Sequence, residues 1–527
     1  MPTAVSLLLL GGCGGDAVPA GSAEIAGSRG GGVYANPVVP GDFPDPSVIR
    51  VGRAYWATAT SSEWGAPFPL LRSTDLVNWD RVGSVFPDLP SWATGSLWAP
   101  EITEDRGRYY VVYTARKRGG PLCVAAASAD APEGPYTDHG PLTCMAVGSI
   151  DGCPIRDENG VRHLVWKEDG NSVGAPTPIW AQELSEDGTA LLGAPVVLFQ
   201  NDAPWEDSVV EGPYLMRHGG RFYAFYSGAG CCGRACSYAL GVARATRLRG
   251  PWEKNPANPI LTGDDAWRCP GHGSVVDDGG GRFFLLYHAY SALDSVYVGR
   301  QGLLDEVLFG ADGWPSFRGG GPSARAASPI APQAPWPAEI VDEFDGGALD
   351  PHWQWPVAAR PDATLEPEGG GWLTLGAMPG APGSHLGAVV GRPTLRGDYE
   401  VTTDVSAPPD VEAGLAAYGD GDNAVGISIG GGRAAVFRLA NGESRMVAET
   451  SAPPRAELRM TVVRGHRFRF AIRAGGAAAW APVGDAVDAE DLPPWDRGVR
   501  AVLFVRGPSG AAARFASFRM AQPSPRR

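Results

Sequence analysis

The chain has 527 residues, with 44 Lys and Arg against 58 Asp and Glu, and a formal net charge of −14 at pH 7. An acidic chain without a basic run binds polyanions poorly, which excludes nucleic acid and acidic lipid surfaces as partners. No run of about 18 apolar residues occurs in this sequence, which excludes a transmembrane helix within it. The 73 Gly and 48 Pro, beside 44% hydrophobic residues and 17 Trp, indicate the turns of a strand-rich protein rather than disorder.

Residues 1–35 are predicted to be an export signal followed by a flexible tether. Residues 4–10 form a short apolar run, and Cys13 follows it in a setting that resembles a bacterial lipobox. The positive residues that usually precede such a run are missing. We expect an extracellular, periplasmic or cell-surface protein whose membrane contact, if any, is a lipid anchor at Cys13.

Strand-like segments rich in aromatic and β-branched residues recur through the first 320 residues. They begin near Tyr55, Tyr109, His163, Phe222 and Phe283, at intervals of 54, 54, 59 and 61 residues. An apolar segment and a turn ending in Arg precede each of them, and another strand and turn follow most of them. Four antiparallel strands at such a period are typical of a propeller blade, so residues 36–317 predict a five-bladed β-propeller. A flat solenoid is the alternative, but it would need capping units that the sequence lacks.

Seven cysteines lie within these repeats, and an exported chain permits disulfides. Cys123 and Cys144 flank one predicted hairpin and form the most plausible pair. Cys231, Cys232 and Cys236 crowd one loop, where we expect a local bridge. Because seven is an odd number, at least one thiol should stay free unless it pairs between chains. Their spacing does not indicate a zinc site.

The composition and periodicity of the sequence change after the repeats. Residues 318–338 are rich in Gly, Pro and Ala, have no period and are predicted to be a linker. Residues 339–522 alternate apolar and polar side chains at a period of two, which predicts a jelly-roll-like β-sandwich. This second domain contains no Cys and few residues suited to acid–base chemistry. The predicted fold class is therefore all-β.

The first residues of each innermost propeller strand should face the axial funnel where propellers bind ligands. These are Asp45, Trp98, Asp151, Glu211 and His272, each 8 to 11 residues before the Arg of the first turn. Carboxylates that lie close together repel, so one keeps its proton while another stays ionised. That combination suits the cleavage of a glycosidic bond, in which an acid protonates the leaving oxygen and a base activates water. A metal cage, the rival use of clustered acids, would favour a DxDxDG-like spacing that these segments lack.

A set of motifs in order along the propeller is similar to glycoside hydrolase family 43. They are the segment around Asp45 (NPVVPGDFPDPS), STDLVNW, LWAPE with Trp98, SID with Asp151, VEGPY with Glu211, and DGWP. The resemblance implies that Asp45 is the general base, Glu211 the general acid, and Asp151 the residue that tunes and orients the acid. His272 resembles an axial histidine near a central calcium or water cluster. The resemblance implies no required cofactor, and a structural calcium at the axis is the metal it suggests.

The resemblance also concerns residues that bind substrate. Arg300 resembles an arginine that contacts substrate or the carboxylates in some members. Trp98, and less strongly Trp64 and Phe68, are candidates for stacking on sugar rings, although aromatic residues also fill blade cores. One departure is that Gly follows Asp151 where the family usually has Pro. Lys167 and Glu168 are interpreted as solvated side chains.

The resemblance predicts an exported, inverting exo-glycosidase that removes arabinofuranosyl or xylosyl residues from plant polysaccharides such as arabinan, arabinoxylan and xylo-oligosaccharides. The C-terminal domain is similar to the concanavalin-like sandwich of family members that act on xylan-derived substrates. An endo-arabinanase and a non-catalytic carbohydrate-binding propeller remain alternatives. The retaining propeller hydrolases that act on fructans share the fold, but they would show first and second motifs that this sequence lacks.

Overall fold

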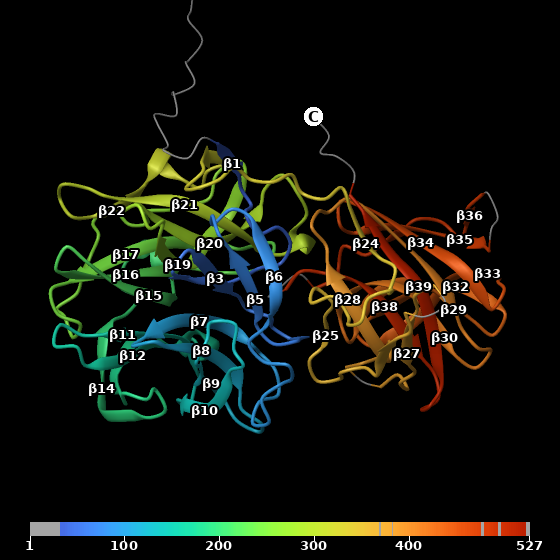
Figure 1. Ribbon diagram of the computed structural model, residues 1–527, viewed down its shortest axis with the longest axis horizontal. Coiled ribbons are helices and arrows are strands. Elements are labelled where there is room, and N and C mark those ends of the chain that lie inside the picture. Colours follow the sequence, from blue (N-terminus) through green and yellow to red (C-terminus); the bar gives the residue numbers. More distant parts are fainter. Residues whose placement is uncertain (1–31, 368–369, 382, 476–478, 494–496, 523–527) are drawn as a thin grey trace, which may run out of the picture.

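The computed structural model describes residues 32–367, 370–381, 383–475, 479–493 and 497–522. It is nearly all-β and consists of a propeller beside a sandwich, which confirms the predicted fold class (Figure 1). The predicted signal, Cys13 and most of the tether lie outside the described residues. No described helix is long and apolar enough to cross a membrane; the helical segments are the 3-10 turns η1 (Gly170–Val173), η2 (Pro204–Glu206), η3 (Val296–Val298) and η4 (Arg318–Gly320).

Five four-stranded antiparallel sheets form the propeller, each built from strands in chain order, with the short strand β4 left out of the first sheet. In chain order they are β2 (Ser47–Val51), β3 (Ala54–Thr58), β5 (Pro69–Ser73) and β6 (Trp79–Ser84); β7 (Trp98–Asp105), β8 (Arg108–Arg116), β9 (Leu122–Ala129) and β10 (Thr137–Thr143); β11 (Ser149–Arg156), β12 (Arg162–Glu168), β13 (Ile179–Leu184) and β14 (Leu191–Phe199); β15 (Val210–His218), β16 (Arg221–Gly228), β17 (Ala239–Ala245) and β18 (Glu253–Lys254); β19 (Trp267–Asp277), β20 (Phe283–Ser291), β21 (Gln301–Phe309) and β22 (Pro315–Phe317). The innermost strands contact one another in the closed order β2, β7, β11, β15, β19 and back to β2. This ring excludes the flat solenoid.

Side chains of one inner strand accept hydrogen bonds from the backbone of the next, which ties neighbouring blades together. Ser47 accepts from the Ile102 N–H at 3.0 Å, and Ser274 accepts from the Val48 N–H at 2.8 Å. In the third blade the same task falls to the buried thiol of Cys153, which accepts from the Leu215 N–H at 3.4 Å. Cys153 is the free cysteine of the described residues, and its role is structural.

The disulfides follow the sequence expectation and extend it. Cys123 pairs with Cys144, and the crowded loop contains the local bridge Cys231–Cys232. Cys236 reaches across to Cys269 on the next blade. Because three bridges form within the described residues, the propeller is suited to an oxidising compartment.

The segment predicted as a linker packs against the propeller. Its strand β23 (Arg325–Ala327) pairs with β1 (Val33–Ala35) ahead of the first blade. The Asn36 side chain donates hydrogen bonds to the Ser323 and Leu304 carbonyl oxygens, at 2.9 and 3.1 Å. Backbone pairing of this kind has no composition signal in a Gly- and Pro-rich segment, which is why the sequence indicated only a connection.

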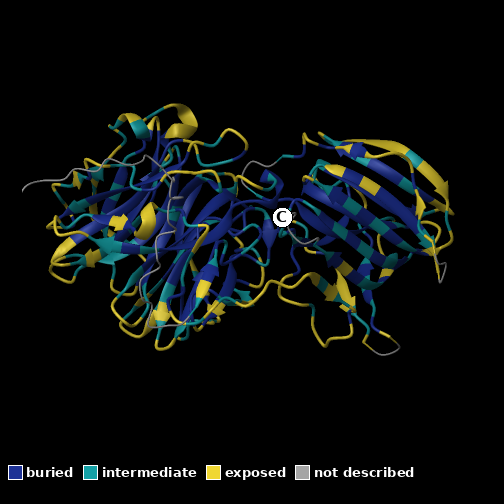
Figure 2. Cartoon of the chain, turned by 90° about the horizontal axis from the view of Figure 1, so that it is seen from above, coloured by how far each residue is buried: buried dark blue, intermediate teal, exposed yellow. Residues whose placement is uncertain are grey.

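Two stacked sheets form the sandwich. One has the order β26, β27, β39, β29, β34, β35, β36, with β24 and β37 at its margins, and the other has the order β28, β38, β30, β31, β32, β33. Buried and exposed residues alternate along its strands, as the period of two predicted (Figure 2). The strands are β24 (Glu339–Asp342), β25 (Trp355–Pro356), β26 (Ala363–Leu365), β27 (Leu373–Gly376), β28 (Ala388–Pro393), β29 (Tyr399–Ser406), β30 (Glu412–Asp420), β31 (Asn423–Gly430), β32 (Arg433–Ala440), β33 (Glu443–Ser451), β34 (Arg455–Val463), β35 (Arg467–Ala474), β36 (Ala481–Pro482), β37 (Val487–Asp488), β38 (Arg500–Arg506) and β39 (Ala512–Ala521).

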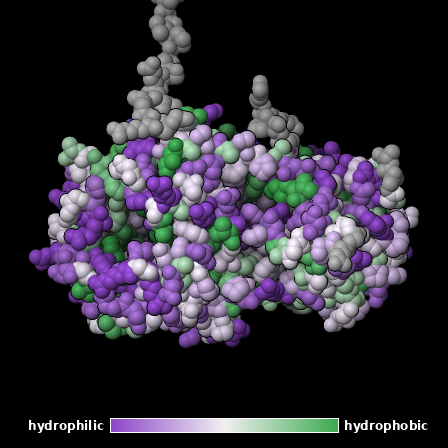
Figure 3. Space-filling view, in the orientation of Figure 1, coloured by the Kyte–Doolittle hydropathy of each residue, from purple (hydrophilic) through white to green (hydrophobic). Residues whose placement is uncertain are grey.

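The sandwich is anchored directly behind the segment that carries Asp45. Asp42 accepts hydrogen bonds from the Gly498 N–H at 2.9 Å and from the Arg500 guanidinium at 3.1 Å. The Val499 N–H donates to the Tyr297 carbonyl at 2.8 Å. Both domains therefore hold the first blade's entry loop. The face drawn in Figure 3 is mainly hydrophilic, with hydrophobic residues scattered over both domains.

Candidate functional site

A backbone irregularity recurs in each of the five inner strands or just before it. Asp45, Ala99, Asp151, Gly212 and His272 all have positive φ, between 39° and 58°. In the last four blades the register between the first two strands shifts at this point. Such bulges bend a strand and re-aim side chains. Three of the predicted site residues occupy the bent position itself, and Glu211 and Trp98 directly precede it.

Asp45 is a buried carboxylate surrounded by a guanidinium, a hydroxyl group and two imidazole rings. Arg300 donates to its Oδ1 at 2.8 Å, and Thr60 donates to its Oδ2 at 2.7 Å. His272 Nδ1 and His288 Nδ1 lie 3.4 and 3.2 Å from Oδ1. Burial acts to raise the pKa of Asp45, but Arg300 and the two histidines outweigh it and hold this pKa far below its usual range. Asp45 therefore stays ionised, as a general base must.

Glu211 lies within a second charge cluster, on β15. Lys167, at the end of β12, donates to Glu211 Oε2 at 2.7 Å and to Asp169 Oδ1 at 3.1 Å, and its side chain is only 1% exposed. The Tyr238 hydroxyl donates to Glu211 Oε1 at 2.9 Å. Burial acts to raise the pKa of Glu211, but Lys167 outweighs it and lowers this pKa below its usual value. The interpretation of Lys167 as solvated was therefore wrong, because the second strand of a blade also faces the next inner strand.

Asp151 contacts the same cluster through a hydrogen bond to the backbone beside Glu211. Its Oδ2 accepts from the N–H of Gly212, the residue after Glu211, at 2.8 Å, and its own N–H donates to Thr114 Oγ1 at 3.1 Å. Burial raises the pKa of Asp151 to about 6, with a further rise from the charge of Glu211 and an opposing effect from His272. Asp151 and Glu211 therefore titrate as a pair. Below about pH 6 the pair holds one proton, and the cation at Lys167 favours Asp151 as its resting position.

The structure buries two of the three predicted aromatic contacts away from these carboxyl groups. Phe68 is 0% exposed and packs against Phe86 and Tyr113 in the core of the first two blades. Trp64 is 2% exposed, and its short strand β4 (Trp64–Gly65) pairs with β25 of the sandwich. Both are corrections to the predicted substrate contacts. Trp98 is half-buried at the pocket end of β7, where a stacking role stays a prediction.

The surroundings of His272 do not fit a calcium ion. Ca²⁺ takes six to eight oxygen ligands in roughly spherical arrangement. The His272 ring instead lies near Asp45, whose Oδ1 is already bonded to the Arg300 guanidinium at 2.8 Å. The backbone N–H of His272 donates to Ser227 Oγ at 2.9 Å. A cation next to Arg300 would be repelled, so we assign no metal to this position.

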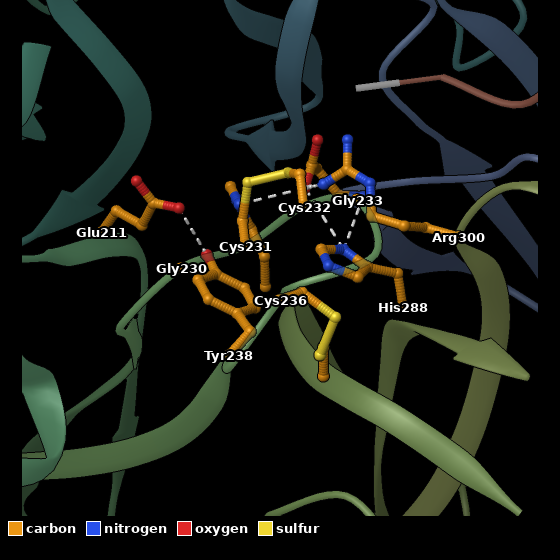
Figure 4. Close-up of a disulfide and its surroundings, with 12 residues drawn as sticks. Glu211, Gly230, Cys231, Cys232, Gly233, Cys236, Tyr238, His288 and Arg300 are labelled. Carbon is orange, nitrogen blue, oxygen red and sulfur yellow. Dashed lines mark hydrogen bonds and ion pairs between the residues drawn. A yellow bond between two sulfur atoms is a disulfide. The ribbon is translucent and has the colours of Figure 1, made fainter. Parts of the chain in front are cut away.

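Four residues that sequence reasoning did not place in the site support its carboxylates: Thr60, Lys167, Tyr238 and His288. His288 is fully buried, its ring stacks on that of Tyr238 at 5.7 Å between centroids, and Figure 4 shows both beside Glu211 and Arg300. Burial lowers the pKa of His288 to about 4, so its ring is neutral near pH 6. Thr60, Lys167 and His288 lie on or just after the second strands, whose period was recognised, but site residues were sought only at the start of the innermost strands. Tyr238 lies at the end of a loop that has no period.

Gly212 is required where Glu211 and His272 meet. Its φ is +58°, and a Cβ there would lie 2.7 Å from His272 Cγ. We expect Gly212→Ala to push the imidazole away from Asp45 and to lower the activity of the site by about 100-fold, since displacements near 1 Å cost that much. Gly219→Ala is the control, because its φ of +55° imposes the same backbone cost with nothing within 4 Å. Equal activity of the two variants would show that contact with His272 is unimportant.

Comparisons with known proteins agree with this geometry. The model for glycosyl hydrolases family 43 matches residues 34–315, and that for the beta xylosidase C-terminal concanavalin A-like domain matches residues 341–520. A xylosidase/arabinosidase of Butyrivibrio fibrisolvens is 28% identical over 297 residues, 53% of this chain and 55% of that protein. Xylosidase/arabinosidase 43B of Humicola insolens is 27% identical over 415 residues, 73% of this chain and 74% of that protein. The crystal structure of the GH43 protein BlXynB from Bacillus licheniformis superposes with a TM-score of 0.80 at 26% identity, covering 93% of this chain and 99% of that one.

Proposed function

Because the chain belongs to glycosyl hydrolases family 43, we propose that it is an exported glycosidase that removes terminal xylosyl or arabinofuranosyl residues from plant polysaccharides or oligosaccharides with inversion. The observation that carries the proposal is that one end of the ring of inner strands holds three buried carboxyl groups, with Arg300 and Thr60 bonded to Asp45, Lys167 bonded to Glu211, and the N–H of Gly212 bonded to Asp151. The names of the Butyrivibrio and Humicola relatives support the two sugar classes. The apolar run before Cys13 and the three disulfides support export.

The residues divide the reaction between them. Asp45, fixed by Thr60 and Arg300, takes a proton from the attacking water. Glu211 donates a proton to the departing oxygen from the state of the enzyme in which the single proton of the Asp151 and Glu211 pair resides on Glu211. Inversion requires base and acid on opposite faces of the sugar, with room of about 6.5–9.5 Å between carboxyls for the water. Each proton transfer contributes roughly 10²–10⁴-fold to the rate.

The pH dependence of kcat/KM should be one-sided. The pKa of Asp45 is far below its usual range, so the base stays ionised on the acid side and that side of the profile is flat. The proton of the carboxyl pair is lost as the pH rises through about 6, so kcat/KM should fall tenfold per unit above that value. Initial rates on a nitrophenyl pentoside in buffers of constant ionic strength measure this profile. A decline toward acid pH with a midpoint near 6 would contradict the assignment.

Hydrolysis of nitrophenyl xyloside, nitrophenyl arabinofuranoside, xylo-oligosaccharides and arabinan oligomers tests the proposal. The control variant Asp45→Asn should lose activity on all of them. Nuclear magnetic resonance of the first product should show the anomer inverted from the substrate. If the wild-type chain cleaves none of these compounds faster than Asp45→Asn does, the proposed function is wrong. If the first product retains its configuration, inversion is wrong.

A further inference from the structure

The loop between β16 and β17, residues 229–238, lies beside Glu211. In the fourth blade Val210 pairs with Gly228 and Glu211 with Ser227, so the end of β16 lies beside the bulge that carries Glu211. The loop starts there and ends at Tyr238, whose hydroxyl donates to Glu211 at 2.9 Å. Both ends of the loop therefore lie next to Glu211, the predicted acid.

The same loop is fixed in place along its length. Cys236 forms a disulfide with Cys269 on β19, and the Gly233 N–H donates to the Tyr290 hydroxyl at 3.0 Å. The Ser237 N–H donates to the Gly230 carbonyl at 2.8 Å. Arg234 donates to the Glu490 carbonyl of the sandwich at 2.8 Å. Contacts with two blades and a second domain make the loop a rigid wall rather than a flap.

The wall presents the disulfide between the adjacent residues Cys231 and Cys232. Both cysteines are half-buried, and in the view of Figure 4 the bridge projects between Glu211 and Arg300. A disulfide carries no N–H or O–H group, so the surface it offers is apolar. The second disulfide of that view, Cys236–Cys269, offers an apolar surface too, whereas the carboxylate, guanidinium and imidazole beside the bridge are polar.

A sugar pocket needs both kinds of surface. Convergent polar groups fix the hydroxyls, and apolar side chains, commonly aromatic, cover the C–H face of the ring. Here Trp64 and Phe68 are buried elsewhere, so two of the predicted apolar contacts do not reach the substrate. Trp98 is the predicted aromatic contact that remains, and an apolar group beside Glu211 would add a second apolar surface.

We propose that the Cys231–Cys232 bridge is a substrate-binding surface, which packs on the C–H face of the sugar held between the predicted acid and base. The inference rests on the proposed function and deepens it by assigning a specificity-determining contact. Cys236–Cys269 and the Tyr290 contact keep the bridge in position. A xylopyranosyl ring has no exocyclic carbon, so its C–H face can approach the bridge closely, whereas arabinofuranosyl and hexopyranosyl rings each carry one.

The test compares two double variants that each remove one disulfide. Cys231→Ala with Cys232→Ala should raise KM for nitrophenyl xyloside or arabinofuranoside about tenfold, since a lost apolar pocket contact costs roughly 10–200-fold. Cys123→Ala with Cys144→Ala, which removes a bridge between the two outer strands of the second blade, should leave KM within twofold of wild type. Peptide mass spectrometry first establishes that Cys231 and Cys232 are oxidised in the wild-type protein.

The pH profile separates a substrate contact from a loop that merely positions Tyr238. If the bridge contacts substrate, the alkaline limb of kcat/KM keeps its midpoint, because Lys167 and Tyr238 still bond Glu211. A shifted midpoint, an unchanged KM, or reduced cysteines in the wild type would overturn the proposal.

If the wild type cleaves no pentoside, the proposed function fails. The proposal for the bridge is then tested separately, by titrating the wild type and the bridge variant with xylose and arabinose. Tenfold weaker binding by the bridge variant supports it, and equal or undetectable binding by both proteins overturns it.

Discussion

Replacing Glu211 by Gln should lower kcat/KM for xylobiose by about 10³–10⁴-fold and for a dinitrophenyl xyloside by far less. The departing oxygen of xylobiose needs a proton, while dinitrophenolate leaves without one, so the loss of a general acid depends on the leaving group. Gln can still accept a hydrogen bond from Tyr238, and Lys167 keeps Asp169 at 3.1 Å as a partner, so the fold should tolerate the change. Steady-state kinetics on the two substrates measure the difference.

Two matched variants complete this experiment. Asp45→Asn should reduce hydrolysis of both substrates alike, because activation of water is needed whatever group departs. Asp151→Asn keeps an acceptor for the Gly212 N–H but removes the proton store of the pair. Its effect should be smaller than that of Glu211→Gln and should move the midpoint near pH 6. If Asp151→Asn, and not Glu211→Gln, loses much more activity on xylobiose than on the dinitrophenyl xyloside, then Asp151 is the acid and the assigned roles are reversed.

The parts of the site that could be predicted are those that repeat along the chain. Asp45, Asp151, Glu211 and His272 stand at equivalent points of successive units, and the structure brings them to one end of the ring of inner strands. The period indicates equivalence but not conformation. It therefore gave no sign of the positive φ that bends each strand and re-aims these side chains.

The residues that were placed wrongly depend on contacts between segments distant in the sequence. Lys167 is buried because β12 faces Glu211 on the next blade, a contact over 44 residues. Trp64 is buried because its two-residue strand pairs with Trp355 and Pro356 of the other domain. From local sequence, a charged residue near a loop is expected to be solvated, and an aromatic residue in a loop can be expected to contact substrate. The packing of blades and domains, which local sequence does not reveal, buries both residues.

Lys167→Met should shift the alkaline limb of the pH profile upward and destabilise the fold. Lys167 is a buried cation between the carboxylates of Asp169 and Glu211. It lowers the pKa of Glu211 and opposes the rise in the pKa of Asp151, so its removal lets the pair keep its proton to higher pH. Removing one partner of a buried ion pair costs about 3–5 kcal/mol of the free energy of unfolding.

The loss of stability should itself depend on pH, and its sign follows from proton linkage. In the wild type the pKa of Glu211 is lowered by folding, so the stability that this group contributes is present at neutral pH and is lost as the pH falls. In the variant the folded carboxyls have raised pKa values and gain protons as the pH falls, which relieves their repulsion. Wild type and variant should therefore differ most at neutral pH and converge in acid, as denaturant unfolding at several pH values would measure.

Lys254→Met separates the electrostatic effect on the site from a general loss of stability. Lys254 is also paired with two carboxylates in the fourth blade, Asp202 at 2.6 Å and Glu206 at 2.8 Å, but it does not bond Glu211. This variant should lose stability while the midpoint of the pH profile stays near 6. An unmoved midpoint in Lys167→Met would mean that the ammonium does not set the proton affinity of the acid. The pairing at 2.7 Å would then serve the fold alone, and the raised pKa of Asp151 would come from burial.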